Sequence, residues 1–376
     1  MVKINSGLWS AIACIIISFF SAISLQSSGM FLSLFAKDLG ASGLQIGVVG
    51  GVQGAAYLIT SIFFGRLSDM KGRLPFIRLG LGLATACYAL HILVNSPVTL
   101  ILVRMMLGFC IAMSDAALMA YNFESSGKTG RFVSLAALGW LTGGFITIFY
   151  QNYHGLFVLS CVSCSVAFAV SWTLAKEQHR HNVRPAITRM IGRNARVYLP
   201  FLLRNIGANM IWVVLPLFMV SLGASLSWVA ILQCMNTATQ FFVMMFVDRI
   251  KASFLFVTGM LMSGLVFVGY ALARNYLQII PFQVVLAVSW SGIYVGALLT
   301  LFKNSEERAT SVAILLSTGS LSQAVGPFLG GAVLQWWGYQ PLMWVAVAFC
   351  VAGTVIAVVA FARKRHTPDV KLSPVN

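Results

Sequence analysis

The sequence predicts an all-α integral membrane protein with twelve transmembrane helices, arranged as two pseudo-symmetric six-helix bundles. Three observations lead to this class: the composition, the number and length of the apolar segments, and an internal repeat. Of the 376 residues, 59% are hydrophobic and 9% are charged, whereas soluble domains have roughly 45–50% and about 25%. This composition excludes a soluble enzyme, and it makes the lipid bilayer the main partner of the chain.

Twelve apolar segments follow one another between short polar breaks. A helix that crosses a bilayer needs about 20 apolar residues. Because lipid cannot satisfy backbone amides, segments of this length are expected to be helices rather than the short alternating strands of a barrel. The expected spans are 8–36, 44–64, 76–94, 98–120, 132–150, 154–175, 198–221, 226–247, 253–273, 277–302, 309–333 and 339–362.

Basic residues fall almost entirely on one side of these segments. The chain has 25 Lys and Arg against 9 Asp and Glu, a net charge of +16. With the N-terminus in the cytoplasm, all but four of the 25 lie in cytoplasmic loops and tails; Lys37 and Arg274 lie on the other side, and Arg104 and Arg204 lie within spans. Cytoplasmic loops are enriched in Lys and Arg. We therefore expect a multi-pass protein of the cytoplasmic (inner) membrane with both termini in the cytoplasm, and the charge does not indicate nucleic-acid binding.

The longest polar stretch divides the chain into two halves. We expect an N-terminal six-helix bundle at 1–175, a cytoplasmic linker at 176–197, a C-terminal six-helix bundle at 198–363 and a cytoplasmic tail at 364–376. The linker is expected to be solvated at the inner leaflet, with a regulatory or partner-binding role as the alternative. The first span has no small-residue cleavage site and is expected to be retained.

Two short motifs recur at nearly half the chain length. Leu39-Gly40-Ala41-Ser42, after the first span, recurs as Leu222-Gly223-Ala224-Ser225 after the seventh. Six spans separate equivalent elements, so both copies have the same orientation and a pseudo-two-fold axis along the membrane normal relates them. A glycine pattern in the fifth span has a counterpart in the eleventh. The residues of this pattern that are expected to pack helices together are Gly139, Gly143, Gly326, Pro327 and Gly330.

The loop after the second span carries the strongest local motif, Gly65-Arg66-Leu67-Ser68-Asp69-Met70-Lys71-Gly72-Arg73. It resembles the G-x-L-x-D-x-x-G-R motif of the major facilitator superfamily, and Arg104 with Gly108 resembles the R-x-x-x-G motif of that family's fourth helix. The resemblance covers essentially the whole chain and implies a monomeric secondary transporter that works by alternating access. The antiporter motif that drug exporters of the family show in the fifth helix is incomplete, because Gly143 is followed by Gly144 and not by proline.

The same resemblance places Asp69 opposite the start of the eleventh helix, where it would act as a cytoplasmic latch. A carboxylate there would meet unsatisfied amides and the positive end of the helix dipole. Gly65 and Gly72 would allow a close approach and a tight turn, and Arg73 would brace the carboxylate. The acid that completes this cluster in the family is either Glu124 or missing. The alternative for Asp69 is an ordinary solvated residue.

Asp115 is the only one of the nine acids that lies well inside an expected span. A lone carboxylate is costly to bury in a membrane, so such a residue is usually functional. Asp115 is therefore the candidate proton carrier, and a structural pairing with an inner-end arginine such as Arg73 is the alternative.

Two arginines also lie within spans. Arg104 precedes Asp115 by three helical turns, about 16 Å along the axis, so the two cannot pair. Arg104 would tune proton coupling or meet substrate, or it would serve as a structural hydrogen-bond hub. Arg204 and Asp115 lie at similar depths, which predicts a bridge between the halves that is closed when the cytoplasmic side is closed and that protonation or substrate would break. The alternative is that Arg204 extends its guanidinium to the inner headgroups.

Polar and aromatic side chains on the helices that line the cavity in this family suit a moderately apolar organic substrate with a few hydrogen-bonding groups. They include Gln26, Asn205, Asn209, Trp212, Trp290 and Tyr294. The expected function is proton-coupled efflux of a small organic compound, and the alternative is transport of a small anionic metabolite by symport, exchange or uniport. No hydrolase or metalloprotease motif occurs, so we expect neither an enzyme nor a metal or cofactor.

Overall fold

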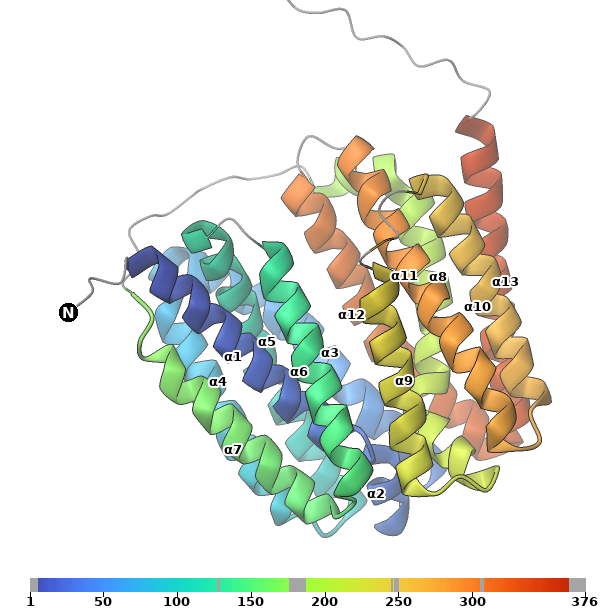
Figure 1. Cartoon of the computed structure of the whole chain (residues 1–376), viewed down its shortest axis with the longest axis horizontal. Coiled ribbons are helices and arrows are strands. Elements are labelled where there is room, and N and C mark those ends of the chain that lie inside the picture. The colour runs from blue at the N-terminus through green and yellow to red at the C-terminus, as the bar shows by residue number, and fades with distance from the viewer. Residues whose placement is uncertain are drawn as a thin grey trace, which may run out of the picture.

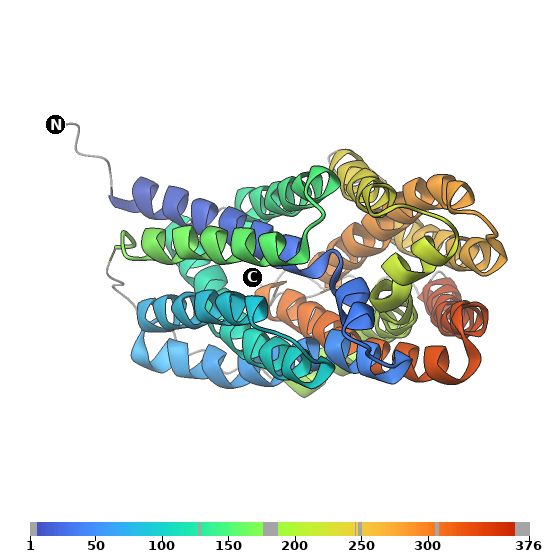
Figure 2. The same ribbon diagram turned by 90° about the horizontal axis from the view of Figure 1, so that it is seen from below.

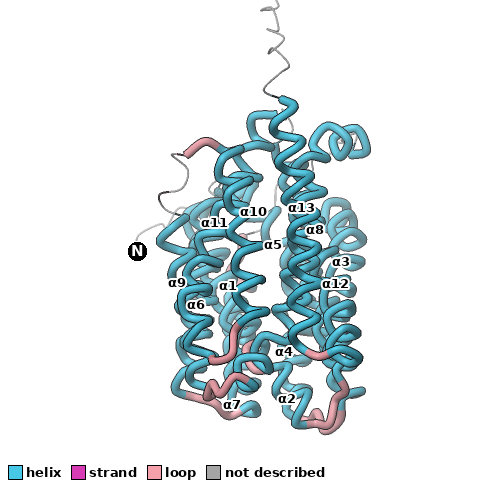
Figure 3. Tube along the Cα trace, turned by 90° about the vertical axis from the view of Figure 1, so that its right-hand side faces the viewer, coloured by secondary structure: helices cyan, strands magenta, loops and turns pink. Residues whose placement is uncertain are grey.

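The computed structural model describes residues 6–126, 129–175, 187–244, 246, 250–304 and 308–364, which form two helical bundles. The N-terminal bundle contains α1 (Ser6–Gly29), α2 (Leu32–Asp38), α3 (Gly43–Lys71), α4 (Leu74–Ile92), α5 (Pro97–Ser126), α6 (Thr129–Phe149) and α7 (Tyr153–Ser171). The C-terminal bundle contains α8 (Ile187–Ser221), α9 (Leu226–Met244), α10 (Ala252–Leu272), the 3-10 helix η2 (Tyr276–Gln278), α11 (Ile279–Asn304), α12 (Arg308–Trp337) and α13 (Tyr339–Lys364). Figures 1 and 2 show the two bundles side by side, and Figure 3 shows that the axes of their helices are roughly aligned, with successive helices alternating in chain direction.

These helices confirm the twelve expected spans of an all-α membrane protein. Among the described residues, ten spans are long and apolar enough to cross a membrane by length and composition, with α1 and α2 counted as one. The other two are α6, whose described apolar stretch covers only Leu135–Phe149, and α9. These two helices pack against each other across the boundary between the bundles.

The first span is broken, whereas the sequence predicts one continuous helix over 8–36. α1 ends at Gly29, and Met30 and Phe31 form a turn before α2 begins. The turn is anchored by burial, because Phe31 is 2% exposed and the ring of Phe35 lies 5.3 Å from that of Phe157 in α7. The break contains neither proline nor charge. The polar run Gln26-Ser27-Ser28-Gly29 precedes it, and its Ser-Gly pair is a turn signal, but this run is too short to divide the apolar segment by hydropathy.

The linker is shorter than the sequence predicts, because α8 begins at Ile187 and not at residue 198. The additional turns are polar on one side and carry buried residues on the other, among them Met190, Asn194 and Val197. Hydropathy detects only the part of a helix that lies in lipid, so it places the start of this helix too late. Residues 176–186 lie outside the described chain.

The two repeated loops have the same structure. Gly40 and Gly223 adopt φ values of 84° and 90°, in the left-handed region that glycine enters most easily. The residue after each glycine donates its amide to a carbonyl five residues earlier, at 3.0 Å in both loops, which is the helix-ending pattern of a Schellman motif. This agreement supports two copies of the same orientation.

The glycines expected to pack helices lie at helix crossings. A Cβ added to Gly143 would lie 3.1 Å from the carbonyl oxygen of Ile23 in α1, and one added to Gly330 would lie 2.7 Å from that of Met210 in α8. Gly139 and Gly326 meet the same two helices, α1 and α8 respectively. The fifth and eleventh spans therefore pack on the first and seventh through equivalent contacts.

Candidate functional site

The bundles meet at one end of the molecule. α1 begins and α13 ends at the same face, at the top of Figure 1, which we call the terminus face. The main contacts between the bundles join α3 with α12 and α6 with α9. In both contacts the helices touch through the halves that lie away from the terminus face. The bundles are therefore closed together at the other end of the molecule, which we call the opposite face.

Glycines make the contact between α3 and α12 very close. A Cβ added to Gly47 would lie 2.6 Å from the Cα atom of Gly331, and one added to Gly54 would lie 2.8 Å from the carbonyl oxygen of Gln323. These distances leave no room for a side chain, so the two backbones touch directly. We call this contact, made by residues 43–54 of α3 and 323–335 of α12, the α3–α12 seam.

Uncharged polar side chains add to the closure of the opposite face. The Oε1 atom of Gln335 accepts a hydrogen bond of 3.4 Å from the backbone amide of Leu44, at the start of α3. The Nε2 atom of Gln151 donates to the hydroxyl of Ser227, at the start of α9. Both bonds join the two bundles, and neither depends on a titratable group.

At the terminus face, the same two helices are apart. A Cβ added to Gly65 of α3 or to Gly319 of α12 would meet no heavy atom within 4 Å, and Figure 1 shows the helix ends of the two bundles separated there. The structure is therefore closed at the opposite face and open between α3 and α12 at the terminus face.

The latch residues occupy the last turn of α3 and the start of α4. Asp69 lies within α3 rather than in a loop, and Gly72, at φ 91°, makes the tight turn that leads to Arg73 and α4. The side chains of Asp69 and Glu124, and those at the start of α12, lie outside the described residues. The latch is therefore still a prediction.

Asp115 lies on α5 and is partly buried. It forms no ion pair or hydrogen bond with any side chain that the structure describes. Its electrostatic neighbours are Tyr57 of α3, Tyr88 of α4 and Cys164 of α7. The alternative pairing with Arg73 is thus not made in this conformation, and the carboxylate has no cationic partner among the side chains that the structure describes.

Arg104 is buried on α5 with 6% of its surface exposed. Its Nε and Nη1 atoms have no hydrogen-bond partner among the described residues. Its electrostatic neighbours are Tyr88 and His91 of α4, and the Nε2 atom of His91 is also buried without a partner. These two atoms give no support to a structural hydrogen-bond hub in this conformation, and the role of Arg104 in proton coupling or substrate binding stays a prediction.

Arg204 does not reach Asp115, so the expected bridge between the halves is not made here. Its Nε atom donates to the hydroxyl of Ser263 at 2.8 Å, and its Nη1 atom donates to Oδ1 of Asn205 at 2.9 Å. Only 2% of Arg204 is exposed, so the guanidinium does not extend to the headgroups either. In this conformation α8 turns the side chain into the C-terminal bundle, where neutral partners bind it. The bridge, which is expected only when the cytoplasmic side is closed, therefore stays a prediction.

The other candidate residues are divided among several contacts. Asn209 donates to the carbonyl of Asn205 at 2.8 Å and lies 3.4 Å from the hydroxyl of Ser322 in α12. Gln26 of α1 lies beside Gly143 of α6. Trp290 and Tyr294 stack on each other on α11.

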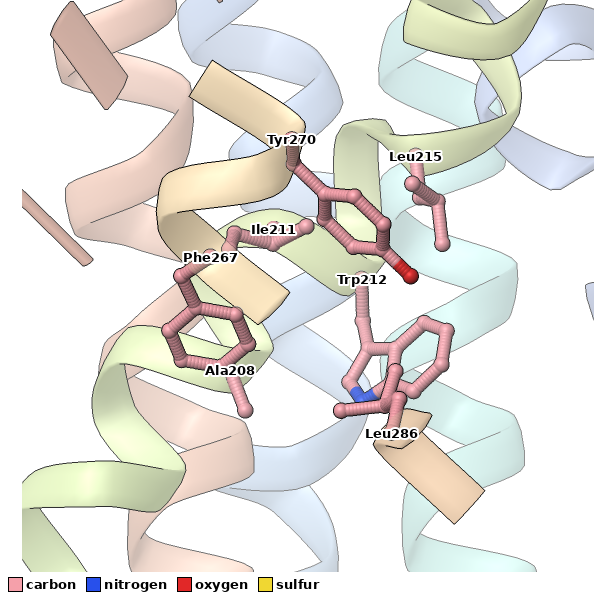
Figure 4. Close-up of a pocket in the computed structure, with 7 residues that line it drawn as sticks. All are labelled: Ala208, Ile211, Trp212, Leu215, Phe267, Tyr270 and Leu286. Carbon is pink, nitrogen blue, oxygen red and sulfur yellow. The ribbon is translucent and has the colours of Figure 1, made fainter. Parts of the chain in front are cut away.

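Trp212 lines a small apolar cavity in the C-terminal bundle. Figure 4 shows the indole beside Leu286 and the hydroxyl of Tyr270 directed between Trp212 and Leu215. The cavity has a volume of about 10 Å³, roughly the space of one water molecule. It is too small for an organic substrate.

Several residues at these contacts carry no separate signal in the sequence: Tyr57, His91, Gln151, Ser227 and Gln335. Their positions depend on how helices distant in the sequence rotate toward one another. The α3–α12 seam is different, because glycines at positions 43, 47, 50, 51 and 54 form the spacing of small residues that typically lets membrane helices approach closely.

Two helical bundles of the same orientation, closed together at one face, are the architecture of secondary transporters built from parallel repeats. The chain belongs to the Major Facilitator Superfamily, whose sequence profile matches residues 14–297 and, in a second alignment, residues 197–374. It is therefore a secondary transporter that binds a small-molecule substrate in the membrane, and not an enzyme.

Solved structures show the same fold. A crystal structure of a point mutant of the nucleoside transporter NupG has a TM-score of 0.78 and 15% sequence identity, covering 95% of this chain and 99% of that chain. A second NupG structure has a TM-score of 0.77 and 12% identity, with 97% and 100% covered. A bacterial homologue of the human lysosomal transporter Spinster, inward-facing and unoccupied, has a TM-score of 0.73 and 15% identity, with 96% of each chain covered. Comparison with curated proteins finds no match.

Proposed function

We propose that this transporter exports a small organic compound by proton antiport and that Asp115 takes up and releases the proton. The observation that supports this proposal is the isolation of Asp115. Its carboxylate lies within a span and has no cationic or hydrogen-bonding partner among the described side chains. An intramembrane acid of this kind is typical of a proton relay. A carboxylate held in an ion pair would instead keep its charge through the cycle.

The distribution of charge supports the direction of access. The basic loops belong to the terminus face, so the positive-inside rule places that face in the cytoplasm. On this assignment the structure is inward-facing. Substrate would bind from the cytoplasm as Asp115 loses its proton, and a proton from the other side would return the carboxylate to its neutral form. One charge that crosses 100 mV supplies about 2.3 kcal/mol for this cycle.

A second candidate is transport of a small anionic metabolite, which Arg104 favours. Its buried guanidinium has no acceptor for Nε and Nη1 within the described part of the chain, and a substrate carboxylate or phosphate would supply one. Arg204 no longer supports this candidate, because Ser263 and Asn205 already satisfy it. NupG, of similar fold, is a nucleoside transporter by its name, and nucleosides are uncharged, which favours the first candidate.

Flux in proteoliposomes tests the proposal, with a substrate found first by thermal-shift screening. In antiport, substrate accumulates in vesicles whose lumen is more acidic than the bath. Asp115→Asn should abolish this uphill accumulation but retain substrate exchange at zero gradient, because exchange needs no proton step. The control is Asp38→Asn, whose carboxylate accepts a hydrogen bond from Tyr153 near the end of α2 and should leave both activities intact. Accumulation driven by an alkaline lumen would refute antiport, and full uphill transport by Asp115→Asn would refute the role of that residue.

A further inference from the structure

Two aromatic rings form a stack near the middle of α11. Trp290 and Tyr294 lie one turn apart with ring centroids 5.7 Å apart and an interplanar angle of 22°. Both side chains are partly exposed. Trp290 is the twelfth of 26 residues in this helix, which places the stack near the level of the bilayer midplane, where transporters of this architecture bind substrate.

The stack is held in place by a buried cation. The Cζ atom of Arg204 lies 5.2 Å from the centroid of the Trp290 ring and 5.8 Å from that of Phe267, distances at which a guanidinium is attracted to an aromatic face. The hydrogen bonds of Arg204 to Ser263 and Asn205 fix the guanidinium. The indole therefore has a fixed orientation before any ligand binds. We call these three side chains the Arg204–Trp290–Tyr294 column.

A hydrogen-bond donor without an acceptor lies beside the column. Asn205 accepts from Arg204 through Oδ1, which assigns the remaining amide atom as Nδ2. That Nδ2 is buried and has no partner among the described residues, although only 4% of Asn205 is exposed. A buried donor left without an acceptor is costly, so a ligand acceptor at this place would stabilise it.

We infer that the Arg204–Trp290–Tyr294 column recognises a planar heteroaromatic ring of the substrate. The ring stacks on the part of the Trp290–Tyr294 stack that Arg204 and Phe201 leave exposed; the ring centroid of Phe201 lies 5.9 Å from that of Trp290. A carbonyl or ring nitrogen of the ligand accepts a hydrogen bond from Nδ2 of Asn205. This inference rests on the proposed function, transport of a small organic compound, and it adds the substrate class. Stacking depends on a flat π face and tolerates different rings, so a saturated ring of the same size and polarity is a poor ligand.

Matched pairs of compounds that differ in ring planarity test this inference on the purified full-length protein. We use uridine with 5,6-dihydrouridine, and 2-pyridone with piperidin-2-one, all uncharged at neutral pH, and measure binding by calorimetry and thermal shift. The aromatic member of at least one pair should bind about tenfold or more tightly than its saturated counterpart, the size of effect that base–aromatic stacking produces. If neither aromatic member binds better than its counterpart, the inference is overturned.

Variants separate stacking from general damage to the bundle. Trp290→Leu and Tyr294→Leu should weaken the aromatic compound about tenfold or more, whereas Trp290→Phe retains a ring and should retain most of the binding. Trp336→Leu is the control, because Trp336 is 66% exposed near the far end of α12 and should bind as the unchanged protein does. Unaltered binding by both Leu variants would contradict substrate recognition by the column and would not affect the proposal that Asp115 couples protons. Selective aromatic binding with no proton-driven flux would instead contradict the proposed function and would leave substrate recognition by the column supported.

Discussion

Arg104 and Arg204 are both buried cations within spans, yet their surroundings differ. Arg204 has two hydrogen bonds and an aromatic face, whereas the Nε and Nη1 atoms of Arg104 have no partner among the described residues. A buried charge that is fully hydrogen-bonded contributes to the fold, and one without partners is a cost that the fold tolerates. We infer from this contrast that Arg204 stabilises the C-terminal bundle and that the guanidinium of Arg104 is free to take part in transport.

This contrast predicts opposite effects of one substitution at the two positions. Arg204→Met should destabilise the protein by about 2–4 kcal/mol, because it leaves Oδ1 of Asn205 without its donor and Ser263 with Ser289 as its remaining partner. Arg104→Met should leave stability unchanged or raise it, because it removes an unpaired buried charge, and it should lower transport. Thermal unfolding in detergent, together with flux, measures both. Greater destabilisation by Arg104→Met than by Arg204→Met would contradict the assignment.

The sequence identified Asp115 correctly as the isolated acid within a span, because counting acids needs no three-dimensional information. The direction in which the Arg204 side chain points could not be predicted from the sequence. The partner of this residue, Ser263, is 59 positions away, and which side of α8 faces α10 depends on the packing of the whole bundle. Depth along a helix is readable from the sequence, but rotation about its axis is readable only where an apolar stripe marks one face.

At the scale of elements, the α3–α12 seam controls the opposite face. Its helices touch backbone to backbone, so closure depends on the absence of side chains at the glycine positions. The uncharged bonds of Gln335 and Gln151 add to it without introducing a dependence on pH. The opposite face therefore opens only when this steric fit is released.

Gly47→Val should wedge the seam open, because a Cβ there would lie 2.6 Å from the Cα atom of Gly331 and overpacking costs about 1–3 kcal/mol. The readout is alkylation of a cysteine introduced at Ala324, which lies buried in the seam, by a membrane-impermeant maleimide. The rate should rise about tenfold, the equivalent of roughly 1.4 kcal/mol. Gly264→Ala is the control, since a Cβ there meets only the sulfur of Cys350 at 3.9 Å. Equal rates in the two variants would show that the seam does not control access.

The turn between α3 and α4 provides a prediction for the terminus face. Gly72 has φ 91° and ψ 153°, a region that is essentially restricted to glycine and costs an ordinary residue about 1–3 kcal/mol, so Gly72→Ala should displace the end of α3 that carries Asp69. Both Gly72→Ala and Asp69→Asn should slow exchange flux by hindering closure of the terminus face, while binding from that face persists. Normal exchange flux in both variants would contradict the hypothesis that Asp69 acts as a latch.

Two helix boundaries show where the sequence is insufficient at this scale. The break between α1 and α2 follows Gln26-Ser27-Ser28-Gly29, a polar run too short to divide an apolar segment by hydropathy, and burial of Phe31 and Phe35 stabilises it. The early start of α8 lies in a polar run that resembles a loop. In both places tertiary packing overrides the local pattern.

For the whole molecule, the fold was predictable because several independent features of the sequence, spread over the whole chain, indicate the same architecture. Composition, twelve apolar segments and the recurrence of Leu39–Ser42 at Leu222–Ser225 each point to two bundles of one orientation, and the repeated loops have matching glycine conformations. The conformational state was not predictable. Two states that differ by a few kcal/mol are compatible with one sequence, and only the contacts of the structure show which face is closed.

The central claim is that the two bundles move so that one face closes as the other opens. Distances between spin labels test it most directly, with one pair at Thr173 and Ser253 near the terminus face and another at His154 and Arg274 near the opposite face, all four exposed, in a background without native cysteines. Substrate or a pH gradient should shorten the first distance and lengthen the second together in the same population of molecules. If the two distances change independently, or if the opposite face stays closed under every condition that supports transport, the claim is wrong.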